Sequence, residues 1–216
     1  MKKIILTIAA LSIIYSSKAQ KAFEKGNVTV SIGAGLDLYG TKIHQVSSGF
    51  TKDTTDGAGG SHFPFMLEYG VANWLGIGAR FNFSNFLEEK DSISHIKPIH
   101  RGIDAGIVLN IHLIKSKRFD MPINLSLGYS YLSIQSKDAL ETIAKSNGLG
   151  YGIALVPRIY FGDHVGMFFN LGFMGYNYPK IKYSNLNDSN LNKTWDTEVS
   201  LKANGVNLGI GLIGKF

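Results

Sequence analysis

The 216-residue chain contains no cysteine and is poor in charged residues. Without cysteine it can have no disulfide framework, no thiolate metal site and no catalytic thiol. Charged residues make up 18% of the sequence, below the roughly 25% of an average soluble domain. Glycine and aromatic residues are abundant instead. This composition argues against a disordered chain, a collagen-like chain and a helical bundle.

The apolar run over residues 4–15 is too short for a transmembrane helix, which needs about 20 residues. Two lysines precede this run, and a segment with small residues follows it and ends at Ala19. A charged, an apolar and a small-residue region in this order are typical of a secretory signal peptide. We therefore expect a cleaved signal peptide over residues 1–19 and a single domain over residues 20–216.

The formal net charge of +6 does not predict a nucleic-acid partner. Half of it comes from Lys2, Lys3 and Lys18, which lie in the expected signal peptide. The remaining chain has no stripe of lysine and arginine interleaved with aromatic residues, as a nucleic-acid interface would require. We expect no nucleic-acid binding.

Eight segments of the sequence alternate between apolar residues and small or polar ones. In the clearest segment, residues 99–113, mostly aliphatic side chains occupy the odd positions, and glycine, valine and polar residues occupy the even ones. A period of two indicates β-strands. The predicted strands are residues 28–39, 63–71, 75–84, 99–113, 123–131, 149–161, 165–174 and 206–216. Soluble strands usually have about 5 or 6 residues, whereas a tilted membrane strand needs about 9 to 11.

The connections between these segments alternate between long and short. The long ones are residues 40–60, 87–98, 133–148 and 179–200, and the short ones are residues 72–74, 115–120 and 162–164. This alternation is typical of an up-and-down barrel with turns at the periplasmic end and loops at the extracellular end. Within the third long loop, capping residues and a closing Asn147-Gly148 predict a short helix over residues 136–147.

The polar face of the strands shows which side of the barrel is buried. A soluble barrel would expose lysine and glutamate on this face, whereas here it carries glycine, serine and asparagine. Small residues fit the crowded interior of an eight-stranded barrel, so the apolar faces point outward. Outward apolar faces require lipid, in which a closed barrel also satisfies the backbone. We predict an all-β fold, an eight-stranded antiparallel up-and-down transmembrane β-barrel with short periplasmic turns and long extracellular loops.

The C-terminal segment, residues 205–216, adds a resemblance to a known family. Together with the length, the strand number and the signal peptide, it resembles the small outer-membrane β-barrel proteins of Gram-negative bacteria, of the OmpA/OmpX type. Alternating apolar residues before a final phenylalanine are similar to the family's recognition tag for the barrel-assembly machinery: Leu208, Ile210, Leu212 and Phe216. The resemblance implies a location in the outer membrane and insertion by that machinery.

Charged residues within the predicted strands are few, and we expect most of them to pair inside the barrel. The expected lumen network consists of Asp37, Glu68, Arg80, Asp104, Arg158 and Lys202. Buried charges are stable only when they are paired and hydrogen-bonded, so such a network would plug the lumen. Arg101 is the exception, because it falls on the lipid face, where it is expected to contact lipid headgroups.

No motif in the sequence identifies an activity. His100 and His112 fall on one face of one strand, too far apart to share a metal ion, and no nucleophile is paired with a base in the sequence pattern. We expect no cofactor, no metal site and no enzymatic activity. We expect instead a monomer that contacts outer-membrane lipids and has a structural or surface-interaction role, with an extracellular ligand bound by its loops. A narrow porin-like channel and a lipid-modifying enzyme are the alternatives.

Overall fold

The computed structural model describes residues 21–47, 49–87, 99–135, 142–185 and 198–216. Its strands are β1 (Val28–Ser47), β2 (Phe50–Ala72), β3 (Leu75–Leu87), β4 (Ile99–Lys115), β5 (Phe119–Gln135), β6 (Thr142–Leu155), β7 (Arg158–Tyr160), β8 (Val165–Tyr178), β9 (Ile181–Asn185) and β10 (Glu198–Lys215). In this part of the chain, no helix is long and apolar enough to cross a membrane.

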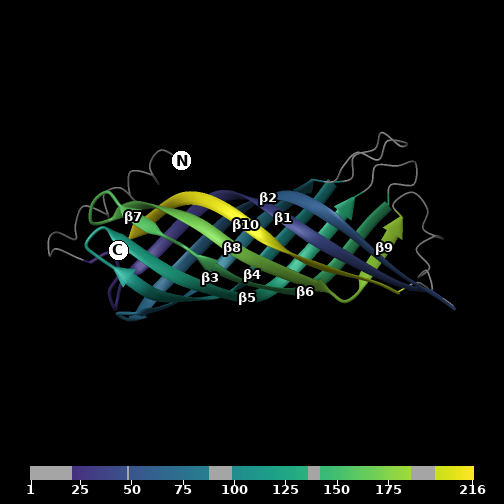
Figure 1. The fold of residues 1–216 in the computed structure, drawn as a ribbon, viewed down its shortest axis with the longest axis horizontal. Helices are drawn as coiled ribbons and strands as arrows, with labels where there is room; N and C mark the ends of the chain where they lie inside the picture. The colour runs from purple at the N-terminus through teal and green to yellow at the C-terminus, as the bar shows by residue number, and fades with distance from the viewer. Residues whose placement is uncertain (1–20, 48, 88–98, 136–141, 186–197) are drawn as a thin grey trace.

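Antiparallel pairing closes the strands into a barrel (Figure 1). The last strand, β10, pairs with β1 from Lys215 opposite Thr29 to Glu198 opposite Val46. The short strands β7 and β9 continue β6 and β8, because β7 pairs with β5 and β8 while β9 pairs with β6. The ten segments therefore form a ring of eight antiparallel strands, which confirms the predicted fold class.

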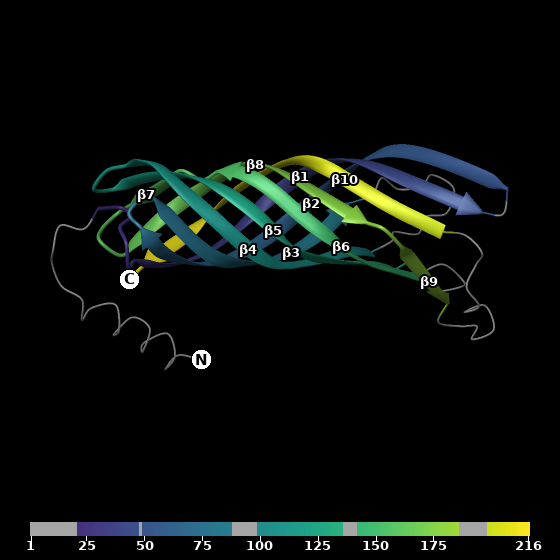
Figure 2. The ribbon, with the colours of Figure 1, turned by 90° about the horizontal axis from the view of Figure 1, so that it is seen from below.

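The first predicted loop is a β-hairpin. Strands β1 and β2 stay in register from Gly40 opposite Gly57 to Ser47 opposite Phe50, and the hairpin extends beyond the other strands (Figure 2). The prediction of a loop over residues 40–60 was therefore wrong. Threonine, isoleucine and valine in this segment favour extended backbone, and its glycines and charges concealed the strand pattern.

The prediction of a helix over residues 136–147 is also wrong for residues 142–147, which the structure describes. Residues 142–147 belong to β6 and pair with β5, and Thr142 to Ser146 also pair with β9. Residues 136–141 lie outside the described residues. The helix prediction relied on local capping signals, which the pairing with strands on both sides overrides.

The outer surface of the barrel carries a continuous apolar band. Leu36 of β1 and Ile107 of β4 expose 68% and 67% of their surface. We name the end of the barrel that carries the long loops the long-loop end. Towards this end, the outward positions of each strand change from apolar residues to small or polar ones. The changes are Leu38 to Gly40, Phe63 to Ser61, Phe83 to Asn85, Ile103 to Arg101, Tyr131 to Ser133, Leu149 to Asn147, Phe173 to Gly175 and Val206 to Asn204. At the opposite, short-turn end, Trp74, Phe161 and Phe216 are exposed. The band thus has a defined edge at both ends.

Candidate functional site in the barrel lumen

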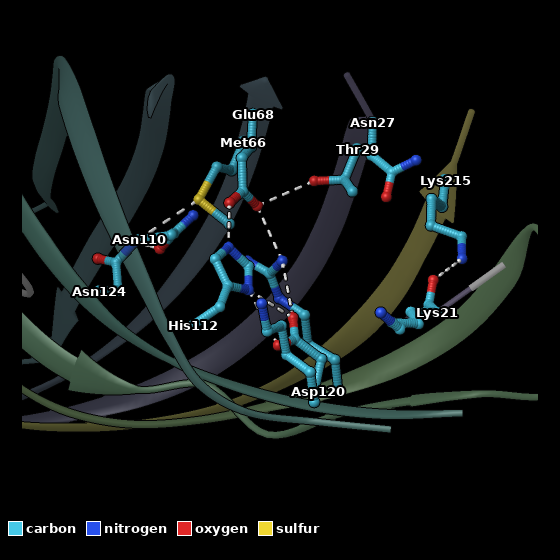
Figure 3. Close-up of polar contacts among 12 residues, drawn as sticks. Lys21, Asn27, Thr29, Met66, Glu68, Asn110, His112, Asp120, Asn124 and Lys215 are labelled. Carbon is cyan, nitrogen blue, oxygen red and sulfur yellow. Dashed lines mark hydrogen bonds and ion pairs between the residues drawn. The ribbon is translucent and has the colours of Figure 1, made fainter. Parts of the chain in front are cut away.

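A buried ion-pair network fills the lumen near the short-turn end (Figure 3). The Glu68 carboxylate on β2 lies 2.8 Å from the Arg158 guanidinium on β7 and 2.9 Å from Nε2 of His112 on β4. Asp120 of β5 lies 2.8 Å from Nδ1 of His112 and 3.6 Å from Arg158. The Thr29 hydroxyl donates to Glu68 at 3.0 Å. All four ionisable side chains are completely buried, so they are stable only as a paired set.

His112 bridges the two carboxylates of this network. Each of its ring nitrogens faces a carboxylate oxygen, of Glu68 on one side and of Asp120 on the other. The Arg158 guanidinium lies beside the same two carboxylates, so Glu68 and Asp120 share two basic side chains.

A glycine on the neighbouring strand makes room for this network. Gly76 of β3 lies beside Glu68, and a Cβ atom at this position would overlap the Glu68 carboxylate. The small residues on the inward face therefore have a direct structural reason here. They leave space in a narrow barrel for one large charged side chain.

The segment before the first strand closes the lumen at the short-turn end. The Phe23 side chain is fully buried, and its ring stacks on His112 with centroids 3.3 Å apart. The Ala22 amide donates to the Ser116 carbonyl at 2.9 Å, and the Lys215 ammonium donates to the Lys21 carbonyl at 2.8 Å (Figure 3). We name residues 21–27 the N-terminal plug. The alternation pattern gave no signal for it, because it precedes the first strand.

A second network closes the lumen towards the long-loop end. Asp104 of β4 accepts hydrogen bonds from Ser130 at 2.5 Å, from Tyr176 at 3.0 Å and from Asn82 at 3.1 Å. The Tyr176 ring stacks on the Tyr178 ring, and the Tyr39 and Tyr176 rings form an edge-to-face contact. These tyrosines belong to a buried cluster that spans the barrel interior.

A cavity of about 50 Å³ separates the two networks. Asp37, His62 and Arg80 line it, and the nearest oxygen of Asp37 lies 2.9 Å from Nδ1 of His62. Arg80 donates to the Ser126 hydroxyl at 3.3 Å, and within the described residues it has no carboxylate partner. A cavity needs roughly 10–15 Å³ of such volume to hold one water molecule, so this one has room for water.

The predicted lumen residues do not form one network. Asp37, Glu68, Arg80, Asp104 and Arg158 lie inside the barrel, and among them only Glu68 and Arg158 form an ion pair with each other. The partners that the sequence did not predict are His62, His112 and Asp120. Asp120 fell within a predicted turn, whereas β5 already begins at Phe119.

The prediction that Lys202 lies in the lumen was wrong, because Lys202 is exposed on the outer face of β10. Lys202 lies an even number of residues from Val206 and Leu208, which face outward. The alternating pattern of the strand therefore already placed its side chain outside the barrel. Arg101 is exposed on the outer face of β4. Leu208, Ile210, Leu212 and Phe216 are exposed at the C-terminal end of the chain.

The described residues contain no group of three or more His, Asp or Glu side chains that could hold a metal ion. Among the described residues, one polar network thus lies towards each end of the lumen, with the cavity between them.

Several solved structures share this fold. The outer membrane protein OprG from Pseudomonas aeruginosa aligns with a TM-score of 0.59 and 12% sequence identity over 90% of this chain and 97% of OprG. Outer membrane protein AlkL aligns with a TM-score of 0.55 and 12% identity over 94% of this chain and 95% of AlkL. The outer membrane protease OmpT from Escherichia coli aligns with a TM-score of 0.51 and 10% identity over 88% of this chain and 97% of OmpT.

These likenesses show the fold, which is that of outer-membrane β-barrel proteins. No protein-family model and no curated protein sequence matches the chain. Because one of the similar barrels is a protease and the others are not named as enzymes, the fold does not identify an activity.

Proposed function

We propose that this protein is a non-enzymatic barrel of the bacterial outer membrane, which binds a ligand outside the cell through its β1–β2 hairpin. The outward apolar band supports the membrane location, because such a surface is stable only in lipid. The lumen is closed by one network towards each end, which favours a surface role over transport. The expected signal peptide over residues 1–19 and the expected tag at Leu208, Ile210, Leu212 and Phe216 are the basis for proposing export and insertion by the barrel-assembly machinery.

The hairpin is the observation that carries this proposal. Beyond Tyr39, β1 stays paired with β2 and, up to Val46, with β10, and residues 42–46 and 50–57 are exposed. Cross-strand contacts still order the hairpin, since Asp53 lies 2.8 Å from the Lys42 ammonium and 2.5 Å from the His44 ring. An ordered projection can present side chains in a fixed arrangement, which lowers the entropic cost of binding.

Apolar side chains on the hairpin favour a contact role. Ile43, Val46 and Phe50 expose 38%, 39% and 60% of their surface, beyond the edge of the apolar band. Exposed apolar groups that lipid does not cover are typical of interaction sites. Phe50, next to the tip, is the side chain with the largest apolar contact area in this group.

A shortened hairpin tests the proposal. Residues 42–55 are replaced by Asn-Gly, which suits a two-residue turn between the paired residues Thr41 and Asp56. Bacteria that display the full chain should aggregate, or attach to surfaces coated with glycan, phospholipid or extracellular-matrix protein. The shortened variant should lose this attachment, and Phe50→Ser should weaken it. Equal attachment by the full chain and the shortened variant would contradict the proposal.

Conductance measurements distinguish the proposal from a channel. The full chain in planar lipid bilayers should show no discrete conductance steps, because both networks block the lumen. Steps that change in amplitude with Arg80→Gln would favour the narrow channel, since Arg80 lines the central cavity. A change in the acyl chains of membrane lipids in an overproducing strain would favour the lipid-modifying enzyme.

A further inference from the structure

Three basic residues share one row on the outer face of the barrel. Cross-strand register places Arg101 of β4 opposite Ser133 of β5, Ser133 opposite Lys145 of β6, and Lys145 opposite Lys182 of β9. Residues directly opposite each other project from the same face of a sheet. Neighbouring strands lie about 4.8 Å apart, so the row spans roughly 14 Å. We name Arg101, Lys145 and Lys182 the basic row.

The basic row lies at the edge of the apolar band. On β4 the outward side chain next to Arg101 is Ile103, and on β5 the one next to Ser133 is Tyr131. On β6, Asn147 alone separates Lys145 from the outward Leu149. The row therefore meets the boundary between hydrocarbon and water at the long-loop end.

Within the part of the chain that the structure describes, no carboxylate pairs with the basic row. All three side chains are exposed, and none of them has an ion-pair partner within the described residues. Two other lysines near this end do have such partners: Lys42 lies 2.8 Å from Asp53, and Lys180 lies 3.9 Å from Glu198. Among the described residues, the row is thus a local excess of positive charge.

We propose that the basic row binds the phosphate group of a glycolipid in the outer leaflet of the membrane. The acyl chains of the lipid lie against the apolar side chains below the row, and its phosphate accepts hydrogen bonds from Arg101, Lys145 and Lys182. A guanidinium can bind phosphate through two parallel hydrogen bonds, and the lysines add positive charge. A ligand at this edge must be both apolar and anionic, which a phosphorylated lipid satisfies. The site depends on the membrane location of the barrel and not on binding by the hairpin.

The test compares two triple variants of the full chain in detergent micelles. R101Q/K145Q/K182Q removes the basic row, and K25Q/K117Q/R118Q removes three exposed charges at the short-turn end as a matched control. Native mass spectrometry measures the binding of diphosphoryl lipid A and of the same lipid without phosphates. Each basic residue near an anionic membrane surface contributes a factor of about five, so the first variant should bind diphosphoryl lipid A about a hundredfold more weakly.

The control should bind like the unchanged chain, and the dephosphorylated lipid should not distinguish the variants. Single variants should give graded losses, and the heat-dependent gel mobility of each variant verifies its fold. Equal affinity of the basic-row variant and the control for diphosphoryl lipid A would overturn the proposal. Displacement of the lipid by inorganic phosphate at millimolar concentration would overturn the assignment to a lipid, because the site would then recognise free phosphate.

Discussion

Removing both partners of the Glu68–Arg158 ion pair should destabilise the barrel by less than the sum of the two single removals. Glu68→Gln removes the carboxylate beside Arg158 and His112 in a site from which water is excluded. Breaking a buried ion pair on one side costs about 3–5 kcal/mol. Arg158→Gln leaves Glu68 and Asp120 buried without their guanidinium partner and should cost a similar amount. The double variant removes both members of the Glu68–Arg158 pair and keeps the contact between His112 and Asp120, so it should lose less stability than the sum of the two single changes.

Equilibrium unfolding in urea, with the barrel folded in lipid vesicles, measures this coupling. Tryptophan fluorescence reports unfolding, because Trp74 is exposed at the edge of the apolar band. Interaction energies between contacting residues are about 0.5–3 kcal/mol, and this pair should lie at the upper end. Lys52→Gln, in the exposed hairpin, serves as a control and should leave the transition midpoint unchanged. Strictly additive effects of the two single changes would refute the coupled network.

The other predictions concern the plug, a lumen glycine and the hairpin. Phe23→Ala removes a fully buried ring and should destabilise the barrel by about 3–5 kcal/mol in the same unfolding assay. Gly76→Ala should reduce the folded fraction on a gel, because its methyl group would overlap a buried carboxylate, whereas Gly57→Ala has open space and should be neutral. Hydrogen bonding to Lys42 lowers the pKa of Asp53 below its ordinary value of 3.8. The stabilisation by Asp53 should therefore be complete above pH 3.8 and be lost as the pH falls through the lower pKa, and Lys42→Met should raise that pKa in a carboxyl NMR titration.

The barrel itself was predictable because the period of two and the surrounding lipid impose the same constraint on every strand. Each strand must direct one apolar face outward. The eight strands and the outward faces of Ile107 and Leu208 follow from a period of two, which each strand repeats independently. The extent of β1 and β2 was not predictable in this way. Beyond Tyr39 neither face is buried, so apolar and polar residues no longer alternate. Cross-strand pairing alone defines the hairpin, and it leaves a weaker pattern.

The candidate site was predictable only in part, for a related reason. Alternation placed Asp37, Glu68 and Asp104 inside the barrel, but it says nothing about which inward side chains meet. Which inward side chains contact each other depends on the tilt of the strands and on the space that glycines leave, as Gly76 does for Glu68. The N-terminal plug has no periodic pattern at all, so its burial against His112 appears only in the folded chain.

The two faces of the same strands carry different constraints, and this explains where binding can occur. In an eight-stranded barrel the interior is only wide enough for side chains, so Glu68 and Arg158 inside the lumen must pair to be stable at all. A conducting lumen would require the N-terminal plug, the network behind it and the tyrosine cluster to move together. The outer rim carries no such packing constraint, because Arg101 and Phe50 are already exposed. Their charge and apolar area are available for a ligand without any rearrangement of the barrel.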